Sequence, residues 1–259
     1  MWKVSKTINV VGEGIAGYVK EMGSMLLLLL DTIRWSFYPP FRLDLLFHQM
    51  ERVGVRSVLV IVLTGAFSGM VLALQSFHFS RSFGAETMVG VGVALSMTRE
   101  LGPVLTSIMV AGRAGSAMAA EIGTMRITEQ IDALSAMAVN PIKYLIVPRV
   151  LASIVVVPIL TIIADFVGIA GGYVVGVTVL GINAGAFVAN MEKYVELDDI
   201  YHGVIKAAVF GLILSIIGCY KGYTTTGGAE GVGKATTQSV VLAAITILMA
   251  NYLLTAAMF

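Results

Sequence analysis

Residues 144–180 read YLIVPRVLASIVVVPILTIIADFVGIAGGYVVGVTVL, and Arg149 and Asp165 are the charged side chains in this stretch. A helix of about 20 apolar residues crosses the roughly 30 Å hydrocarbon core of a bilayer. The stretch is longer than that, so we expect either kinks at Pro148 and Pro158 or a start that lies along the membrane interface. Its length and apolarity predict a membrane-spanning helix.

The composition extends this prediction to the whole chain. Of the 259 residues 57% are apolar and 13% are charged, and the mean hydropathy is +0.88. A soluble domain typically has about 25% charged residues. The sequence therefore predicts an all-α, polytopic membrane protein.

Five apolar runs follow residue 52, and we predict one transmembrane helix for each. Their approximate bounds are Val53–Phe77, Met88–Ala111, Tyr144–Leu180, Ile200–Tyr220 and Thr236–Phe259. We expect two parts, an N-terminal helical segment (1–52) and a five-span membrane domain (53–259).

The N-terminal segment differs from the rest because it is charged and its apolar block, Met25–Leu30, is too short to span. Trp35 and Tyr38 come just before the Pro39–Pro40 break. Aromatic side chains beside a short apolar block are typical of a helix in the membrane interface. We predict an N-terminal interfacial helix.

The basic residues predict the orientation, since short cytoplasmic loops collect Lys and Arg. With the N-terminus inside, the cytoplasmic side receives Lys3, Lys6, Lys20, Arg34, Arg42, Arg52, Arg56, Arg113, Arg126, Lys143, Arg149, Lys221 and Lys234. The opposite side keeps Arg81 and Lys193. The segment 181–199, acidic from Asn190 to Asp199, is then periplasmic.

Glycines recur at four-residue spacing in two predicted spans. They are Gly65 and Gly69 in the first, and Gly168, Gly172 and Gly176 in the third. Such spacing allows helix backbones to approach closely in lipid. It predicts tight packing, either within one chain or between two.

The stretch 111–151, AGRAGSAMAAEIGTMRITEQIDALSAMAVNPIKYLIVPRVL, contains a short amphipathic pattern over Thr124–Ala136. Apolar side chains at helical spacing alternate with four polar ones, Arg126, Glu129, Gln130 and Asp132. The pattern predicts a helix parallel to the membrane on the cytoplasmic side. Either this helix docks a cytoplasmic motor, or it is an interfacial loop helix with no partner.

The same stretch, with LSMTRELGPVLTSIMVAGRAGSA (95–117), resembles the signature of the MlaE/YrbE permeases. GMVLALQ (69–75) and GYTTTGGAEGVGKATTQSVV (222–241) agree with it. The resemblance covers roughly His48 to Phe259. It implies the multi-pass permease of an ABC transporter in the bacterial inner membrane, a homodimer that moves phospholipids.

Several partners are implied by the resemblance alone. They are a cytoplasmic ATPase dimer, which binds ATP and magnesium, and a periplasmic hexamer of MCE-domain protein. The resemblance leaves open whether a small STAS-type regulatory subunit is also present. The family's coupling helix falls on Thr124–Ala136. We expect no catalysis and no cofactor in this chain, and no nucleic-acid partner.

Gly228–Ala235 nearly fits the phosphate-loop pattern GxxxxGK[ST]. That chemistry needs a preceding strand and a hydroxyl after the lysine for magnesium. Here a span precedes the motif and Ala235 replaces the hydroxyl residue. We predict a flexible glycine-rich turn without a nucleotide.

Polar residues also occur inside the predicted spans. Arg99 and Glu100 lie in the second span, Lys206 in the fourth and Asn251 in the fifth. An ionisable group at membrane depth costs about 2.5–3.5 kcal/mol on insertion scales, so it normally faces a partner or a wet cavity. Neighbouring residues on a helix point about 100° apart, so Arg99 and Glu100 cannot share one partner. We predict that Lys206 pairs with Glu100, either around a central cavity or as an ion pair that fixes packing.

The resemblance implies that Glu100 and Lys206 line the central lipid pocket. The best-studied family members have an acidic residue at the position of Asn251. With Asn251 there, Arg99 and Lys206 would face only Glu100. We therefore expect a more positive cluster that favours anionic headgroups.

The remaining candidates carry weaker signals. The resemblance implies that Gln75, Phe79 and Phe83 lie at the periplasmic mouth of the pocket. Asp165, deep in the third span, suggests a structural hydrogen bond. His48, His78 and His202 show no metal-ligand spacing, so we expect no metal site.

A second function from another class is a self-sufficient secondary transporter or channel, with Arg99, Glu100 and Lys206 as an ion relay. Such carriers usually contain an internal repeat. Five spans do not divide evenly, and the sequence shows no repeat. An ATP-driven permease is the better interpretation.

Overall fold

A computed structural model describes residues 2–39 and 42–258, and within those ranges it describes side chains from residue 19 onward. In this part of the chain every regular element is a helix. In chain order they are α1 (Trp2–Ser36), α2 (Leu43–Val53), η1 (Val55–Ser57), α3 (Val58–Arg81), η2 (Glu86–Met88), α4 (Val89–Ser96), η3 (Met97–Leu101), α5 (Gly102–Val110), η4 (Ala111–Gly115), α6 (Ser116–Ile127), α7 (Gln130–Ala136), η5 (Ile142–Ile146), α8 (Val147–Val174), η6 (Val175–Val179), α9 (Ala184–Tyr194), α10 (Leu197–Tyr223) and α11 (Gly228–Met258). The all-α fold is confirmed.

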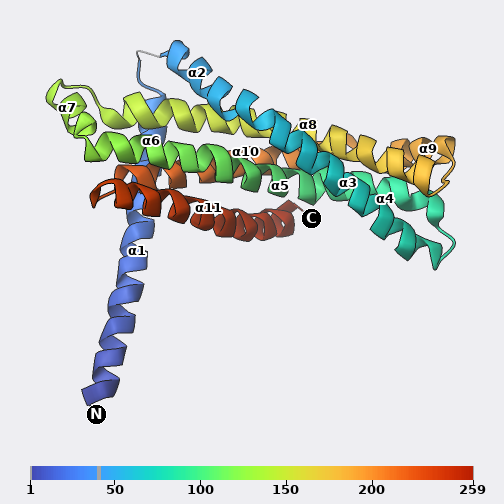
Figure 1. Cartoon of the computed structure of the whole chain (residues 1–259), viewed down its shortest axis with the longest axis horizontal. Helices are drawn as coiled ribbons and strands as arrows, with labels where there is room; N and C mark the ends of the chain where they lie inside the picture. Colours follow the sequence, from blue (N-terminus) through green and yellow to red (C-terminus); the bar gives the residue numbers. More distant parts are fainter. Residues whose placement is uncertain (1, 40–41, 259) are drawn as a thin grey trace.

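The long helices run along one bundle axis, with α7 at one end and α9 at the other (Figure 1). We call these the α7 end and the α9 end. Among the described residues, four helical stretches are long and apolar enough to cross a membrane: Leu43–Arg81, Ile142–Val179, Leu197–Tyr223 and Gly228–Met258. They contain four of the five predicted spans, which confirms a polytopic membrane protein.

The predicted second span, Met88–Ala111, corresponds to α4, η3 and α5 and is not one of these four stretches. Its helical path is continuous, but Arg99 and Glu100 interrupt its apolar run. The count of five spans therefore stays a prediction.

The predicted glycine contacts lie within the chain, between α3 and α8. A Cβ on Gly69 would lie 1.8 Å from the carbonyl oxygen of Gly168, and one on Gly65 would lie 2.8 Å from that of Ala164. A Cβ on Gly172 would meet a Val93 methyl at 2.8 Å. Backbones at such distances leave no room for side chains, so this glycine pattern holds α8 against α3 and α4.

Helix α1 runs transverse to the bundle near the α7 end (Figure 1). Its C-terminal half packs on the bundle through Leu28 and Thr32, both buried, and an ion pair joins Glu21 to Lys221 of α10. If the bundle axis follows the membrane normal, a transverse helix lies in the membrane plane. The interfacial location of this helix stays a prediction. Lys3 and Lys6 have side chains outside the described residues, and so does the Pro40 half of the predicted Pro39–Pro40 break.

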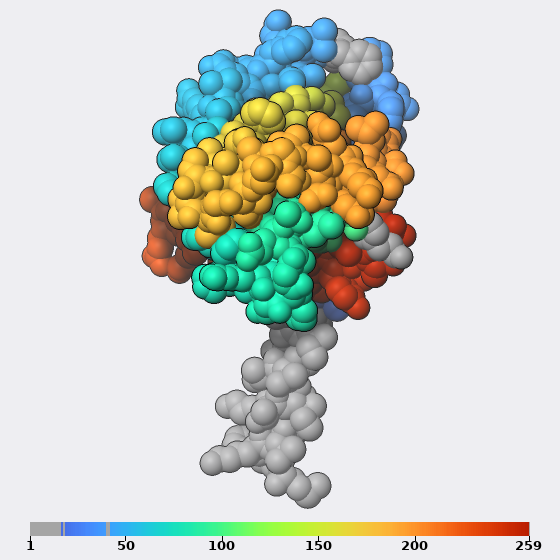
Figure 2. All heavy atoms as spheres, turned by 90° about the vertical axis from the view of Figure 1, so that its right-hand side faces the viewer, coloured from blue at the N-terminus to red at the C-terminus, as the bar shows by residue number. Residues whose placement is uncertain are grey.

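The α9 end is closed by α9 and the first turn of α10, which lie beside the turn after α3 (Figure 2). Asn190 donates to the carbonyl of Thr87 at 3.0 Å, which ties α9 to that turn. The buried ring of Phe187 packs edge-on against Tyr173, with ring centroids 5.5 Å apart. The segment 181–199 thus forms an ordered cap.

Two local predictions were wrong. The helix predicted over 124–136 is broken, because Glu129 adopts a left-handed backbone (φ 58°) between α6 and α7. The glycine-rich segment 228–235 is the first two turns of α11 and not a flexible turn. Only Gly227 and Gly228 have positive φ there, at the sharp entry into the helix.

Candidate functional site

Lys206 of α10 is the centre of a buried polar network. Its side chain is fully buried, and its ammonium donates to Glu100 Oε1 at 2.7 Å, to the Arg99 carbonyl at 2.9 Å and to Thr255 Oγ1 at 2.8 Å. An ammonium has three N–H donors, so these acceptors satisfy all of them. The predicted Lys206–Glu100 pair is confirmed.

The local sequence explains why the Arg99 carbonyl accepts from a side chain. Pro103 has no N–H, so it cannot donate to the carbonyl four residues earlier. The backbone widens into a π turn over Met97–Leu101 at this point, as often happens at functional sites. Lys206 thus replaces a missing helix hydrogen bond and pairs with Glu100 in the same place.

The approach of α10 to this π turn requires Gly203, one turn before Lys206. A Cβ on Gly203 would lie 2.1 Å from the Thr98 carbonyl oxygen. No larger residue fits there without separating the two helices. The glycine therefore sets the distance at which Lys206 reaches the π turn.

Glu100 is the exposed member of the network, with 36% of its side chain accessible. Besides Lys206 it accepts from Asn251 Nδ2 at 2.8 Å and from Thr255 Oγ1 at 2.9 Å. The sequence interpretation missed Thr255, although it lies four residues after Asn251 and therefore on the same helix face. Three helical segments, η3, α10 and α11, thus meet at one carboxylate.

Arg99 does not face this network. Its Nε and one terminal nitrogen both lie 2.6 Å from Asp199 Oδ1, and the Asp199 side chain is nearly buried at the start of α10. Asp199 also caps that helix by accepting from the Glu196 N–H at 3.0 Å. The sequence interpretation assigned Asp199 only to an acidic outward segment.

The predicted positive cluster is therefore wrong. Arg99 is neutralised by Asp199, and Lys206 is enclosed and saturated by its three acceptors. The exposed charge of this network is the Glu100 carboxylate, which lies beside the Asn251 amide. The basis for a preference for anionic headgroups at this site is lost.

Asp165 of α8 is buried against Gly102, and its Oδ1 lies where a Gly102 Cβ would be. That oxygen has no hydrogen-bond partner among the described residues. The structural hydrogen bond predicted for Asp165 is therefore not present at this atom.

The three predicted mouth residues lie on α3 and the turn after it. Phe79 and Phe83 are exposed and pack on each other, with ring centroids 5.3 Å apart, and Gln75 is exposed on the same helix. The polar contacts around Glu100 involve none of them. Their role at a mouth stays a prediction.

At the α7 end, α7 presents a polar surface on a fixed base. Ile131 is buried, while Gln130 and Asp132 are exposed, and Arg126 pairs with Asp132 at 2.7 Å. Gln130 donates to the Thr128 hydroxyl at 3.0 Å. The buried Ile131 anchors this short helix to the core. The predicted polar residues lie on it or just before it: Arg126, Glu129, Gln130 and Asp132.

An ion-pair bridge connects the helices beneath α7. Glu121 of α6 pairs with Arg52 of α2 and with the buried Arg149 of α8, each at 2.9 Å. Arg113 donates to the Ser57 hydroxyl at 2.8 Å and to the carbonyls of α2's last residues. These contacts join α6 to α2 and α8, and join Arg113 of η4 to the end of α2.

Metal and nucleotide sites find no support among the described residues. No three His, Cys, Asp or Glu side chains there lie close enough to share a metal ion. The near match to a phosphate loop lies on α11, and α10 precedes it where a strand would be required.

Comparisons with known proteins assign the chain to a family. The profile described as Permease MlaE matches residues 46–257, which include α7 and the whole Glu100 network. A probable ABC transporter permease protein of Rickettsia conorii is 46% identical over 251 residues, 97% of each chain. The intermembrane phospholipid transport system permease protein MlaE of Haemophilus influenzae is 40% identical over 253 residues, again 97% of each. A probable ABC transporter permease protein of Synechocystis is 46% identical over 212 residues, 82% of this chain and 81% of that one.

Proposed function

The chain belongs to the MlaE permease family, and we propose that it is the membrane subunit of an ATP-driven phospholipid transporter. The observation that carries the proposal is that one family match, over 46–257, contains both a buried polar network and an anchored exposed helix. A lipid path needs polar groups at membrane depth. A motor outside the membrane needs a rigid element on which to act.

In the mechanism we propose, α7 docks into a separate cytoplasmic ATPase. Ile131 holds α7 in the core, so that motion of the docked helix is transmitted to the bundle instead of bending a loop. The Arg52–Glu121–Arg149 bridge passes it to α2 and α8. ATP and magnesium belong to the partner, and this chain hydrolyses nothing.

The lipid path runs past Glu100. A headgroup meets its exposed carboxylate, while Lys206 holds that carboxylate in place from behind. Because this fixed group is an anion, it can pair with the ammonium group of a zwitterionic phospholipid headgroup. Two copies of the chain enclose the path, and the lipid passes to or from a periplasmic MCE protein.

The orientation we propose places the α7 end in the cytoplasm of a multi-pass inner-membrane protein. That end carries Arg52, Arg113, Lys143 and Lys221, whereas the loops of the α9 end carry Arg81 and Lys193. The basic excess favours this orientation. A STAS-type subunit, if the assembly has one, binds on the same side.

Reconstitution tests the proposal against a self-sufficient carrier. The chain is co-expressed with a candidate ABC-type ATPase from the same organism, purified through a tag on the permease alone, and placed in vesicles with fluorescent phospholipid. We expect co-purification and lipid transfer that requires ATP. Transfer by the permease alone, driven by a proton or sodium gradient, would instead establish the secondary carrier.

A further inference from the structure

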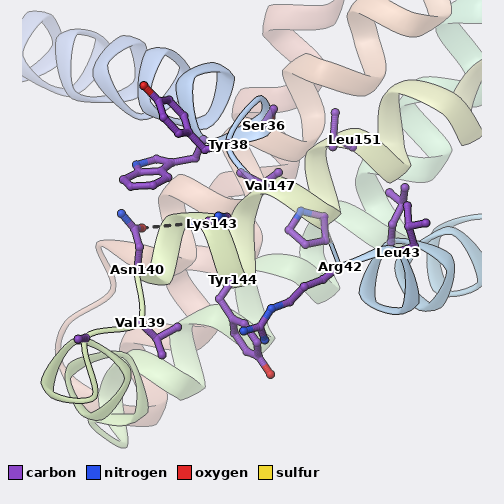
Figure 3. A pocket seen from close by; sticks show the side chains of 14 residues that line it. Ser36, Tyr38, Arg42, Leu43, Val139, Asn140, Lys143, Tyr144, Val147 and Leu151 are labelled. Carbon is purple, nitrogen blue, oxygen red and sulfur yellow. Dashed lines mark hydrogen bonds between the residues drawn. The ribbon is translucent and has the colours of Figure 1, made fainter. Parts of the chain in front are cut away.

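A second site lies where α1, α2 and the segment after α7 meet. A cavity of about 410 Å³ opens there, and the side chains that line it come from all three segments (Figure 3). It shares no residue with the Glu100 network. The transport mechanism proposed above makes no use of it.

Two basic side chains at this cavity are held by aromatic rings. The Arg42 guanidinium lies 4.8 Å from the centroid of the Tyr144 ring, and Lys143 Nζ lies 5.7 Å from that of Trp35. Lys143 Nζ also donates to the Pro39 carbonyl at 2.8 Å. A stacked guanidinium still presents N–H donors at its edge, and an ammonium has three donors, so both groups suit the oxygens of a phosphate.

Most of the remaining cavity wall is apolar, with Ser36 and Asn140 as further polar residues. Leu43 and Leu46 of α2 line it, together with Val147 and Leu151 of α8. A free phosphate ester has no use for such a wall. A phosphate joined to acyl chains matches both parts, since its oxygens meet the basic pair and its first methylenes cover the leucines.

The position in the fold agrees with this ligand. Trp35 and Tyr38 lie at the end of the transverse helix α1, with ring centroids 5.8 Å apart, and such pairs mark the level of lipid headgroups. The cavity is at the basic α7 end, where anionic lipids accumulate under basic segments. The site therefore borders the headgroup layer and not the water beyond it.

We propose that this cavity binds one anionic phospholipid of the leaflet on the α7 side, with its phosphate between Arg42 and Lys143. The bound lipid joins α1 to η5. Because η5 follows α7 in the chain, the same lipid stabilises the base on which α7 stands. It acts as a fixed ligand and is not the transported one.

The test uses Trp35 as a reporter, because the chain has only one other tryptophan, Trp2. The full chain with Trp2→Phe is placed in phosphatidylcholine nanodiscs. It is titrated with phosphatidylglycerol or phosphatidylcholine brominated near the headgroup end of the acyl chains. We expect saturable quenching of Trp35 by the brominated phosphatidylglycerol well above that by the brominated phosphatidylcholine.

The double variant Arg42→Gln/Lys143→Gln should lower the affinity for phosphatidylglycerol roughly 25-fold, because each basic side chain near an anionic lipid contributes about a factor of five. The matched control is Lys20→Gln/Arg34→Gln, which removes two exposed charges of α1 outside the cavity and should change affinity less than about twofold. Leu43→Gln, at a half-exposed wall position that folding tolerates, should weaken binding without removing charge.

Three results would overturn the proposal. Equal quenching by the two brominated lipids would show that the cavity does not select an anion. An unchanged phosphatidylglycerol affinity in Arg42→Gln/Lys143→Gln would show that the phosphate does not bind between these two side chains. Full reversal of quenching by soluble glycerol 3-phosphate would show that the site takes a free phosphate ester and not a lipid.

Discussion

Removing the Glu100 charge should destabilise the permease more than removing its partner's. In Glu100→Gln the Lys206 ammonium, which has no solvent exposure, stays buried without an opposite charge. Breaking a buried pair in this way costs about 3–5 kcal/mol. In Lys206→Met the remaining carboxylate is 36% exposed and keeps its bonds from Asn251 and Thr255, so we expect roughly half of that loss.

The assay is unfolding of the purified permease by a denaturing detergent in mixed micelles, followed by circular dichroism of its helices. The double variant Glu100→Gln/Lys206→Met contains neither charge and should be more stable than Glu100→Gln alone. The control is Glu230→Gln, at an exposed α11 pair with Lys234, which should change stability by less than about 1 kcal/mol. If Lys206→Met were the more damaging single change, burial would not set the energetics of this network.

Two further predictions concern packing and coupling. Gly69→Ala should weaken folding strongly, since its Cβ would lie 1.8 Å from the Gly168 carbonyl oxygen. Gly233→Ala is the control, and it should be neutral or slightly stabilising because the space around Gly233 is open. Equal thermal stability of the two variants would contradict the α3–α8 contact. Asp132→Lys should abolish stimulation of the partner ATPase by the permease while leaving helicity unchanged, because the change inverts the exposed docking surface. The swap Arg126→Glu/Asp132→Lys restores the internal pair but not that surface, so recovery of stimulation in the swap would mean that the pair serves only α7's own structure.

The spans were predictable because apolar runs of membrane length have few other solutions. Four of the five predicted runs lie in helices of spanning length, and the glycine spacing correctly indicated close helix packing. The sequence left open whether that packing joined two chains. Only the approach of Gly69 to Gly168 decided that it lies within one chain.

The partner of Arg99 was not predictable from periodicity. Asp199 is 100 residues away and lies in a segment that composition assigns to solvent. The break at Glu129 was hidden for a local reason, because a glutamate rarely adopts positive φ and nothing in its neighbours indicates a turn. The failure at Arg99 therefore depends on a long-range contact that one sequence does not display, and the failure at Glu129 on an uncommon local backbone conformation.

Thr255 shows what a more complete interpretation would have found. Asn251 was singled out as a polar residue at membrane depth, and the residue four positions later shares its helix face. The sequence also shows that Pro103 has no backbone N–H, so the Arg99 carbonyl lacks its usual helical hydrogen-bond donor. Lys206 of α10 meets both groups, since it donates to the Arg99 carbonyl and to Thr255 Oγ1.

We propose that lipid passes the Glu100 network under the control of an ATPase docked on α7. The direct measurement is ATP-dependent phospholipid transfer by the reconstituted complex that contains Glu100→Gln/Lys206→Met, a variant expected to fold and assemble. The control complex contains Glu230→Gln/Lys234→Met, which removes a charged pair from the exposed start of α11. We predict that the first complex binds its ATPase and hydrolyses ATP but transfers little lipid, while the control transfers at the wild-type rate. Wild-type transfer by the Glu100→Gln/Lys206→Met complex would contradict the account.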